Sequence, residues 1–249
     1  MNTSLPDSTE SWRSWSESWE EHMEFKGSRI PEHQVSTRIH EVISLWEKPL
    51  PSNWRRKDFG YIKAKGYRRG NKERAKLEHL LEIRLFAQLT WRVTGLREEV
   101  AFFPILNAIS LANTNEKQRE IDVLRILKFP NRSIPCSVEM KGATTNHAWH
   151  AVVENLQHLK LLHGHPRDFL SKVSNESPCD QFRNLSLSET WGTVLAPSSF
   201  FNDRGKKENS FRHAKRLIKC IKQEIGVIIL LACFPDEAEK PIEVLSHPD

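Results

Sequence analysis

The sequence lacks the features that mark disulfide-rich, zinc-finger and membrane proteins. Its 249 residues include four cysteines, and none of them lies in a CxxC or CxxH motif that would bind zinc or act as a redox pair. No apolar run reaches the ~18 residues needed to cross a membrane, and the acidic N-terminus does not have the pattern of a signal peptide. No internal repeat is present. We therefore expect a soluble, cytoplasmic protein whose cysteines are buried thiols.

Positive charge is concentrated in two parts of the chain, although the net charge is only +5. Residues 55–76 hold ten Lys or Arg against two acids, with aromatic residues interleaved. Lys and Arg neutralise phosphates and aromatic rings stack on bases, so this segment predicts contact with DNA, with RNA as an alternative. A solvated basic loop or a nuclear-localisation-like tract is the rival interpretation. The residues expected to contact nucleic acid are Arg55, Arg56, Lys57, Lys63, Lys65, Arg68 and Arg69, together with Arg212, Lys215, Arg216 and Lys219 of a later helix.

A β-hairpin is predicted in the middle of the chain, where two segments of alternating polar and apolar residues flank the turn sequence Phe-Pro-Asn-Arg. If the hairpin folds about the middle of that turn, residues whose numbers sum to 261 face each other. Asp122 then faces Glu139, and Glu120 faces Lys141, with facing Cβ atoms ~5 Å apart. The pairing therefore brings carboxylates and an ammonium onto one patch of the sheet.

The facing carboxylates of Asp122 and Glu139 repel each other unless a cation lies between them. Magnesium or manganese suits that position, because both prefer oxygen ligands and leave room for water and substrate oxygens. Such an ion lowers the pKa of a bound water and stabilises a phosphoryl transition state, while Lys141 orients the nucleophile or neutralises charge on the phosphate. The alternative is a cross-strand salt network of Glu120, Glu139 and Lys141 on a solvated face.

The spacing Asp-(x)16-Glu-x-Lys, on a hairpin followed directly by a helix, resembles the PD-(D/E)xK nuclease superfamily over residues 73–234. The matching residues are Asp122, Glu139 and Lys141, although the proline that precedes the aspartate in the signature is absent here. The resemblance implies a restriction-endonuclease-like core and metal-dependent hydrolysis of DNA. It also implies that Asp122 and Glu139 hold Mg2+ or Mn2+ and that the main-chain carbonyl of Met140 is a further ligand.

Two further features of the superfamily have counterparts in this chain. RecB-like members carry a glutamine in the next helix, and the similarly placed Gln157 is expected to orient the site. A long helix is predicted over residues 72–94, and the superfamily commonly places a glutamate of such a helix near the metal ion. Glu82 is the first candidate and Glu78 the second, with a surface salt bridge as the alternative for either. A slighter similarity, to the endonuclease subunit of heteromeric transposases, is carried by Glu82, Phe86, Leu89 and Arg97-Glu98.

The predicted elements follow the order helix, three strands, helix, strand, helix and strand. This order indicates an α/β fold with a mixed central β-sheet flanked by helices, and it is also the order that the resemblance requires. The later elements are a helix starting at Thr144 or Thr145, a strand from Trp191 to Pro197, an amphipathic helix from Phe211 to Ile225 and a buried strand from Val227 to Phe234. We divide the chain into a helical N-terminal extension (1–54), a basic segment (55–76) and a nuclease-like domain (77–249).

The N-terminal extension contains two predicted helices, the second over residues 31–46. In the acidic first helix Trp12, Trp15 and Trp19 recur at helical spacing and form one apolar stripe. Exposed tryptophan stripes promote aggregation, so we expect the stripe to dock on the chain's own body. Binding of a partner protein through the same stripe is the alternative.

Five histidines between residues 147 and 165 make zinc a second candidate metal, which we disfavour because no cysteine pair accompanies them. The sequence thus predicts a Mg2+- or Mn2+-dependent nuclease. One rival is a catalytically inactive nucleic-acid-binding or scaffold protein that keeps the fold. Another is an adaptor that recruits a partner through its tryptophan helix.

Overall fold

The computed structural model describes residues 11–23, 30–51, 91–95, 100–106, 109–113, 118–142, 147–164, 189–201, 208–235 and 240–246. The helices are α1 (Trp12–Met23), α2 (Glu32–Glu47), α4 (Ala148–Gly164), α6 (Ser198–Phe201) and α7 (Glu208–Ile225). The strands are β1 (Trp91–Thr94), β2 (Val100–Leu106), β3 (Ile109–Asn113), β4 (Gln118–Ile121), β5 (Val123–Lys128), β6 (Ser133–Met140), β7 (Trp191–Pro197), β8 (Ile229–Phe234) and β9 (Ile242–Ser246). Among the described helices, none has the length and apolar character needed to span a bilayer.

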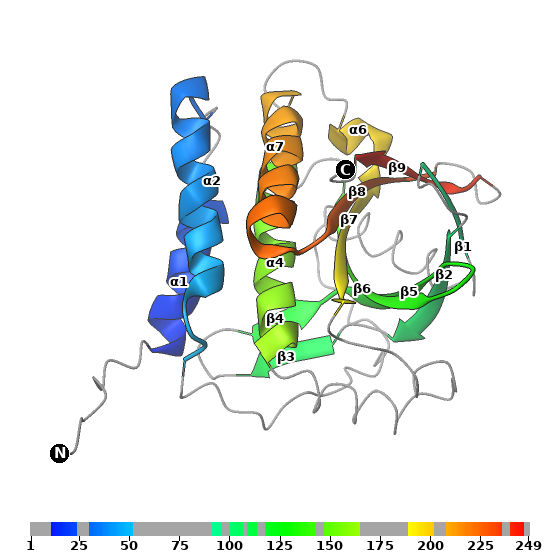
Figure 1. Cartoon of the computed structure of the whole chain (residues 1–249), viewed down its shortest axis with the longest axis horizontal. Coiled ribbons are helices and arrows are strands. Elements are labelled where there is room, and N and C mark those ends of the chain that lie inside the picture. The colour runs from blue at the N-terminus through cyan, green and yellow to red at the C-terminus, as the bar shows by residue number, and fades with distance from the viewer. Residues whose placement is uncertain are drawn as a thin grey trace, which may run out of the picture.

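The described strands form a curled mixed sheet that closes on itself, with α1, α2, α4 and α7 on one side of it (Figure 1). The strand order is β1, β2, β5, β6, β7, β8, β9, and β9 pairs with β1 to complete the ring. Strands β6, β7 and β8 are parallel, with α4 and α7 as the crossover connections that parallel strands require. Strands β3 and β4 form a separate two-stranded sheet. The predicted α/β fold, a mixed sheet with flanking helices, is therefore confirmed.

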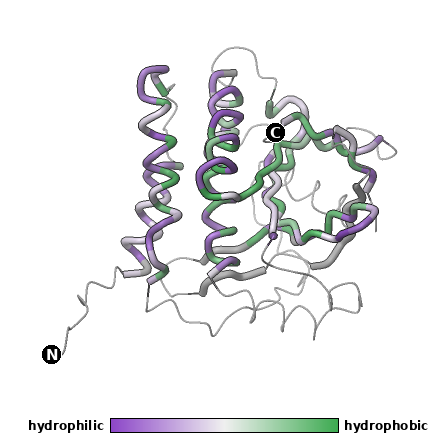
Figure 2. The backbone as a smooth tube through the Cα atoms, in the orientation of Figure 1, coloured by the Kyte–Doolittle hydropathy of each residue, from purple (hydrophilic) through white to green (hydrophobic). Residues whose placement is uncertain are grey.

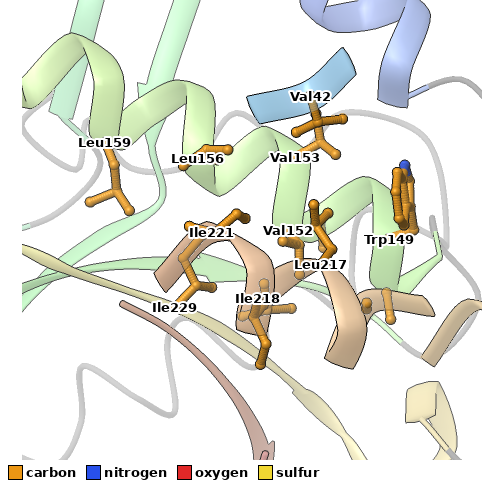
Figure 3. Packing of buried hydrophobic residues seen from close by; sticks show 14 of the residues in the cluster. Val42, Trp149, Val152, Val153, Leu156, Leu159, Leu217, Ile218, Ile221 and Ile229 are labelled. Atoms are coloured by element: carbon orange, nitrogen blue, oxygen red, sulfur yellow. The ribbon is translucent and has the colours of Figure 1, made fainter. Parts of the chain in front are cut away.

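Two apolar cores lie on opposite sides of the curled sheet, because successive residues of a strand face opposite sides. One core comes from the strands and the β5–β6 turn, and it includes Val123 and Val138 inside the ring. The other joins the four long helices to outward-facing strand residues such as Ile126 and Leu231. Figure 3 shows the centre of this second core, where α4 packs against α7. In Figure 2 the helices alternate between hydrophobic and hydrophilic residues, as expected for helices with one buried face.

The N-terminal helix α1 is part of the second core. Trp15 and Trp19 are both fully buried there, so the expected docking of the tryptophan stripe on the chain's own body is confirmed for these two residues. The side chain of Trp12 lies outside the described residues. Trp149 of α4 donates its indole N–H to the backbone carbonyl of His22 at 3.0 Å, which satisfies a carbonyl in the last turn of α1.

The β5–β6 hairpin has the predicted register. Val123 lies opposite Val138, and the pairing continues in step to Lys128 opposite Ser133, next to the turn. Every pair in this ladder has numbers that sum to 261. The turn thus sets the register that the sequence predicts, although both faces of β6 are buried in the structure.

The predicted first strand of the hairpin is interrupted at Asp122, which lies between β4 and β5. The backbone N–H of Met140 donates to Asp122 Oδ2 at 2.8 Å. At this position the Asp122 side chain, and not a backbone carbonyl of the neighbouring strand, accepts the hydrogen bond from β6. Strand β4 pairs with β3 instead and places Glu120 opposite Ser110. The predicted pairing of Glu120 with Lys141 is therefore wrong.

The end of the helix predicted over residues 72–94 is also wrong, because Trp91–Thr94 forms strand β1. Its residues alternate between buried and exposed, which is the pattern of a strand with one face in a core. Gly95 follows with φ +87°, and a Cβ at this position would lie 2.6 Å from the carbonyl oxygen of Val244. Glycine thus permits the close approach of β1 to β9. Residues 72–90 of the predicted helix lie outside the described residues.

Helix α4 begins at Ala148, and not at Thr144 or Thr145 as predicted. The backbone N–H of Trp149, one of the free donors of the first turn, donates to Ser210 Oγ of α7 at 3.2 Å. This donor of the first turn is therefore satisfied by a side chain of another helix, and Thr144 and Thr145 lie outside the described residues.

Gly192 of β7 provides a stability prediction for the packing of α4 on the sheet. A Cβ here would lie 2.0 Å from Asn155 Oδ1, and Asn155 is held by donating to the Ser137 carbonyl at 3.2 Å. We expect Gly192→Ala to lower the free energy of unfolding by ~1–3 kcal/mol, because the added methyl group overpacks this contact. Chemical denaturation measures the change. In an Asn155→Ala background the cost should shrink, and an equal cost in both backgrounds would contradict the clash.

Candidate active site

The predicted site residues meet where β5 begins and β6 ends. The hydrogen bond from Met140 N–H to Asp122 Oδ2 holds the Asp122 side chain beside β6. There it is in hydrogen-bonding contact with the Glu139 carboxyl. Lys141 follows at the end of β6 and donates its backbone N–H to the Leu195 carbonyl at 3.0 Å. The fold therefore brings the three residues of the Asp…Glu-x-Lys pattern to one place.

Lys141 is the positive centre of this cluster. Its Nζ lies 2.5 Å from Glu139 Oε1 and 2.8 Å from Glu154 Oε2, and its side chain is 9% exposed. Burial alone would lower the pKa of Lys141, but the negative charges of Glu139, Glu154 and Asp122 outweigh burial and raise that pKa well above its usual value. The ammonium is therefore charged and held in place at neutral pH.

Glu139 is buried in a site with more carboxyl groups than cations. Burial, followed by the negative charge of Glu154, raises the pKa of Glu139 to about 8, although Lys141 and Asp122 act in the opposite direction. The ring Nδ1 of His158 lies 3.2 Å from Glu139 Oε2. Among the described residues, three carboxyl groups thus surround one ammonium. Such an arrangement favours the entry of a further cation.

Glu154 and His158 are not among the predicted site residues. Burial would raise the pKa of Glu154, but Lys141 and then His150 lower it well below its usual value, so the carboxylate is ionised. A signal for these residues exists in the sequence, where His150, Glu154 and His158 recur every four residues in the helix after the Glu-x-Lys strand. Residues at this spacing share one helix face, and that face meets the site.

Helix α1 reaches the site through His150. The ring Nδ1 of His150 lies 3.1 Å from the Met23 carbonyl oxygen, and its Nε2 lies 3.5 Å from Glu154 Oε2. A carbonyl oxygen only accepts, so Nδ1 carries the proton in the first of these contacts. The last turn of α1 therefore orients the residue that stands beside Glu154.

Gln157 lies in α4 next to these residues, and its side chain is completely buried. Within the described part of the chain, neither its amide oxygen nor its amide nitrogen has a hydrogen-bond partner. A buried amide without partners is costly. The role of Gln157 in orienting the site stays a prediction.

The remaining predicted residues divide into two groups. Arg212 and Arg216 of α7 form ion pairs with Glu32 of α2, Lys215 lies over the Phe211 ring at 4.8 Å, and Lys219 is exposed. The residues outside the described part of the chain are Glu78, Glu82, Arg55, Arg56, Lys57, Lys63, Lys65, Arg68 and Arg69.

No group of three or more His, Cys, Asp or Glu side chains that could hold a metal ion is found within the described ranges. The pair that best suits a hard divalent cation is Asp122 with Glu139, since both offer carboxylate oxygens. The predicted third carboxylate, Glu82 or Glu78, belongs to a segment beyond these ranges. A scan against protein-family models, a search of curated proteins and a search of solved structures give no match to this chain.

Proposed function

We propose that this protein is a metal-dependent nuclease that hydrolyses phosphodiester bonds of DNA. The observation that carries the proposal is the buried ammonium of Lys141, which lies 2.5 Å from Glu139 with Asp122 alongside. An isolated ammonium of this kind would be expensive to bury. Its position among carboxylates at the end of a strand is what an Asp…Glu-x-Lys phosphodiesterase site needs.

The donor set of the site fits a magnesium or manganese ion. Asp122 and Glu139 would hold it through carboxylate oxygens, with the Met140 carbonyl as the further ligand that the superfamily resemblance implies. The fit rests on charge, because Asp122, Glu139 and Glu154 all act on the single ammonium of Lys141, and a divalent cation would offset the carboxylates that remain. When bound, the ion supplies a water of lowered pKa and stabilises negative charge on the phosphate.

The chain's own residues have distinct tasks in this proposal. Lys141 presents a fixed ammonium that orients the attacking water or neutralises charge on the scissile phosphate. Glu154 keeps this ammonium in position at 2.8 Å and remains ionised, so Lys141 does not depend on Glu139 alone. Gln157, which is fully buried in α4, would help to orient this site, as the resemblance implies.

The restriction-endonuclease-like identity of the fold is also a proposal. It is supported by the order of elements around the site, since β2, β5 and β6 are consecutive antiparallel neighbours. Helix α4 follows directly and crosses to β7, which lies parallel to β6. The site residues thus lie next to the start of β5, at the end of β6 and on α4, which is the arrangement that the resemblance implies.

The test is a cleavage assay with the full chain. A supercoiled plasmid and a labelled single strand are incubated with Mg2+, Mn2+ or EDTA. We expect cutting with either metal ion and none with EDTA, because the carboxylate pair has no catalytic water of lowered pKa without the ion. No cutting with either metal, in samples that still shift DNA on a gel, would favour the catalytically inactive nucleic-acid-binding protein instead.

A further inference from the structure

A second charged cluster lies where the first turn of α2 meets α7. Arg212 donates from Nη2 to Glu32 Oε2 at 2.7 Å, and Arg216 donates from Nη1 to Glu32 Oε1. The ring Nε2 of His213 lies 3.2 Å from Glu32 Oε2. Three side chains of one helix therefore converge on a single carboxylate.

The three donors form a preformed anion site. The side chain of His213 is 2% exposed, so its direction is fixed by packing, and Nε2 must carry the proton because a carboxylate only accepts. The hydrogen bond from His213, followed by the charges of Arg212 and Arg216, lowers the pKa of Glu32. Arg212 and Arg216 are 57% and 41% exposed, so this site is open to solvent.

Glu32 is suited to being displaced from this site. It is the first residue of α2, its side chain is 58% exposed, and exposed ion pairs contribute little to stability. A phosphate group offers more acceptor oxygens than a carboxylate and forms bidentate pairs with arginine. Lys215 and Lys219 are exposed on the same face of α7 as Arg212 and Arg216, so this face carries four cations, of which Glu32 pairs with two.

We propose that Arg212, His213 and Arg216 form a phosphate-binding site for the backbone of a nucleic acid, and that Glu32 occupies this site in the free protein as an internal competitor. The proposal rests on the nucleic-acid substrate proposed above. It adds a defined point, away from the reacting phosphate, at which the nucleic acid is held. It also identifies Glu32 as a residue that weakens binding at this point.

The experiment measures binding of a short fluorescein-labelled DNA duplex to the full chain in EDTA, so that no metal-dependent cleavage intervenes. We expect Glu32→Gln to bind about three- to tenfold more tightly than wild type, since the competitor loses its charge. Glu47→Gln is the matched control, because Glu47 is an exposed glutamate of the same helix and its replacement changes the net charge equally. The control should leave the affinity nearly unchanged.

Further variants test whether the effect of Glu32→Gln on DNA affinity depends on Arg212 and Arg216. In an Arg212→Gln/Arg216→Gln background, Glu32→Gln should no longer tighten binding, because the donors that Glu32 occupies are gone. Thermal unfolding of each variant checks that the fold persists. Equal gains for Glu32→Gln and Glu47→Gln would overturn the proposal, because the gain would then reflect net charge alone.

Two further outcomes would also overturn the proposal. One is the absence of duplex binding by every variant at low salt. The other is a response to Glu32→Gln that is seen with phosphatidylserine vesicles and not with DNA, since the phosphate would then belong to a membrane surface. The nuclease proposal fails separately, when wild type binds DNA without metal-dependent cleavage, and that result would leave the phosphate site intact.

Discussion

Asp122→Asn is expected to abolish metal-dependent cleavage of DNA while leaving the fold intact. The substitution removes one of the two carboxylates proposed to hold the metal ion, and loss of one charge-stabilising group of this kind costs roughly 10²- to 10³-fold in rate. The asparagine side chain keeps an oxygen that can accept the Met140 N–H, which in the wild type bonds Asp122 Oδ2 at 2.8 Å. Initial rates of plasmid cleavage in Mg2+ and Mn2+ measure the effect.

The control for this variant is Glu189→Gln, which removes an exposed carboxylate that pairs with Arg132. We expect it to cleave at the wild-type rate. Denaturation midpoints should agree among the wild type and both variants, and DNA binding in EDTA should persist in all three. Cleavage by Asp122→Asn within a few-fold of wild type would remove Asp122 from the site. A large loss of stability would show instead that the Asp122 charge holds the β4–β5 bend together.

Lys141→Met is expected to have the largest effect on stability, in addition to abolishing cleavage. The wild-type ammonium lies between Glu139 and Glu154, and both of these carboxyls are largely buried. Removing one partner of a buried ion pair leaves uncompensated charge and costs about 3–5 kcal/mol. Methionine keeps the length of the side chain, so lost packing contributes little. The free energy of unfolding from urea titration measures the cost.

The stability cost of Lys141→Met should also depend on pH. Without the ammonium, the pKa of Glu139 rises beyond the value of about 8 that it has beside Lys141, and the pKa of Glu154 is no longer held low. A carboxyl with a raised pKa in the folded state binds protons more tightly than it does in the unfolded chain, so its stability contribution is lost as the pH rises. Glu139 keeps its proton up to about pH 8 in the folded state of both proteins, so in EDTA its contribution should widen the difference from wild type above about pH 8. Glu154, whose pKa burial raises once Lys141 is absent, should widen the difference above its unfolded-state pKa, from about pH 4–5 upward.

Lys128→Met provides the matched control, because Lys128 is an exposed lysine of β5. Its replacement should change the free energy of unfolding by no more than about 0.5 kcal/mol. Adding Glu154→Gln to Lys141→Met should restore part of the lost stability, since one uncompensated carboxylate is removed. If Lys141→Met were as stable as the control at pH 8, the ammonium would not be compensating these carboxylates.

The sequence by itself determined the elements whose patterns are local. The alternation on either side of the Phe-Pro-Asn-Arg turn specified the β5–β6 register from Val123 opposite Val138 onward, and with it the meeting of Asp122 and Glu139. A continuously apolar run predicted the buried strand β8, and an amphipathic period predicted α7. Gly226 follows α7 with φ +71°, the left-handed conformation that ends a helix.

The tertiary structure alone decided the features that depend on partners distant in the sequence. Strand β9 was not predicted, and β1 was assigned to a helix, because each becomes a strand by pairing with the other and with neighbours across the ring. The strand break at Asp122 follows from a side chain that bonds Met140 of the neighbouring strand. The hydrogen bond from Trp149 of α4 to Ser210 and the pairing of Lys141 with Glu154 likewise depend on contacts between different elements. Periodicity records which face of an element is buried, but it does not record which distant residue meets that face.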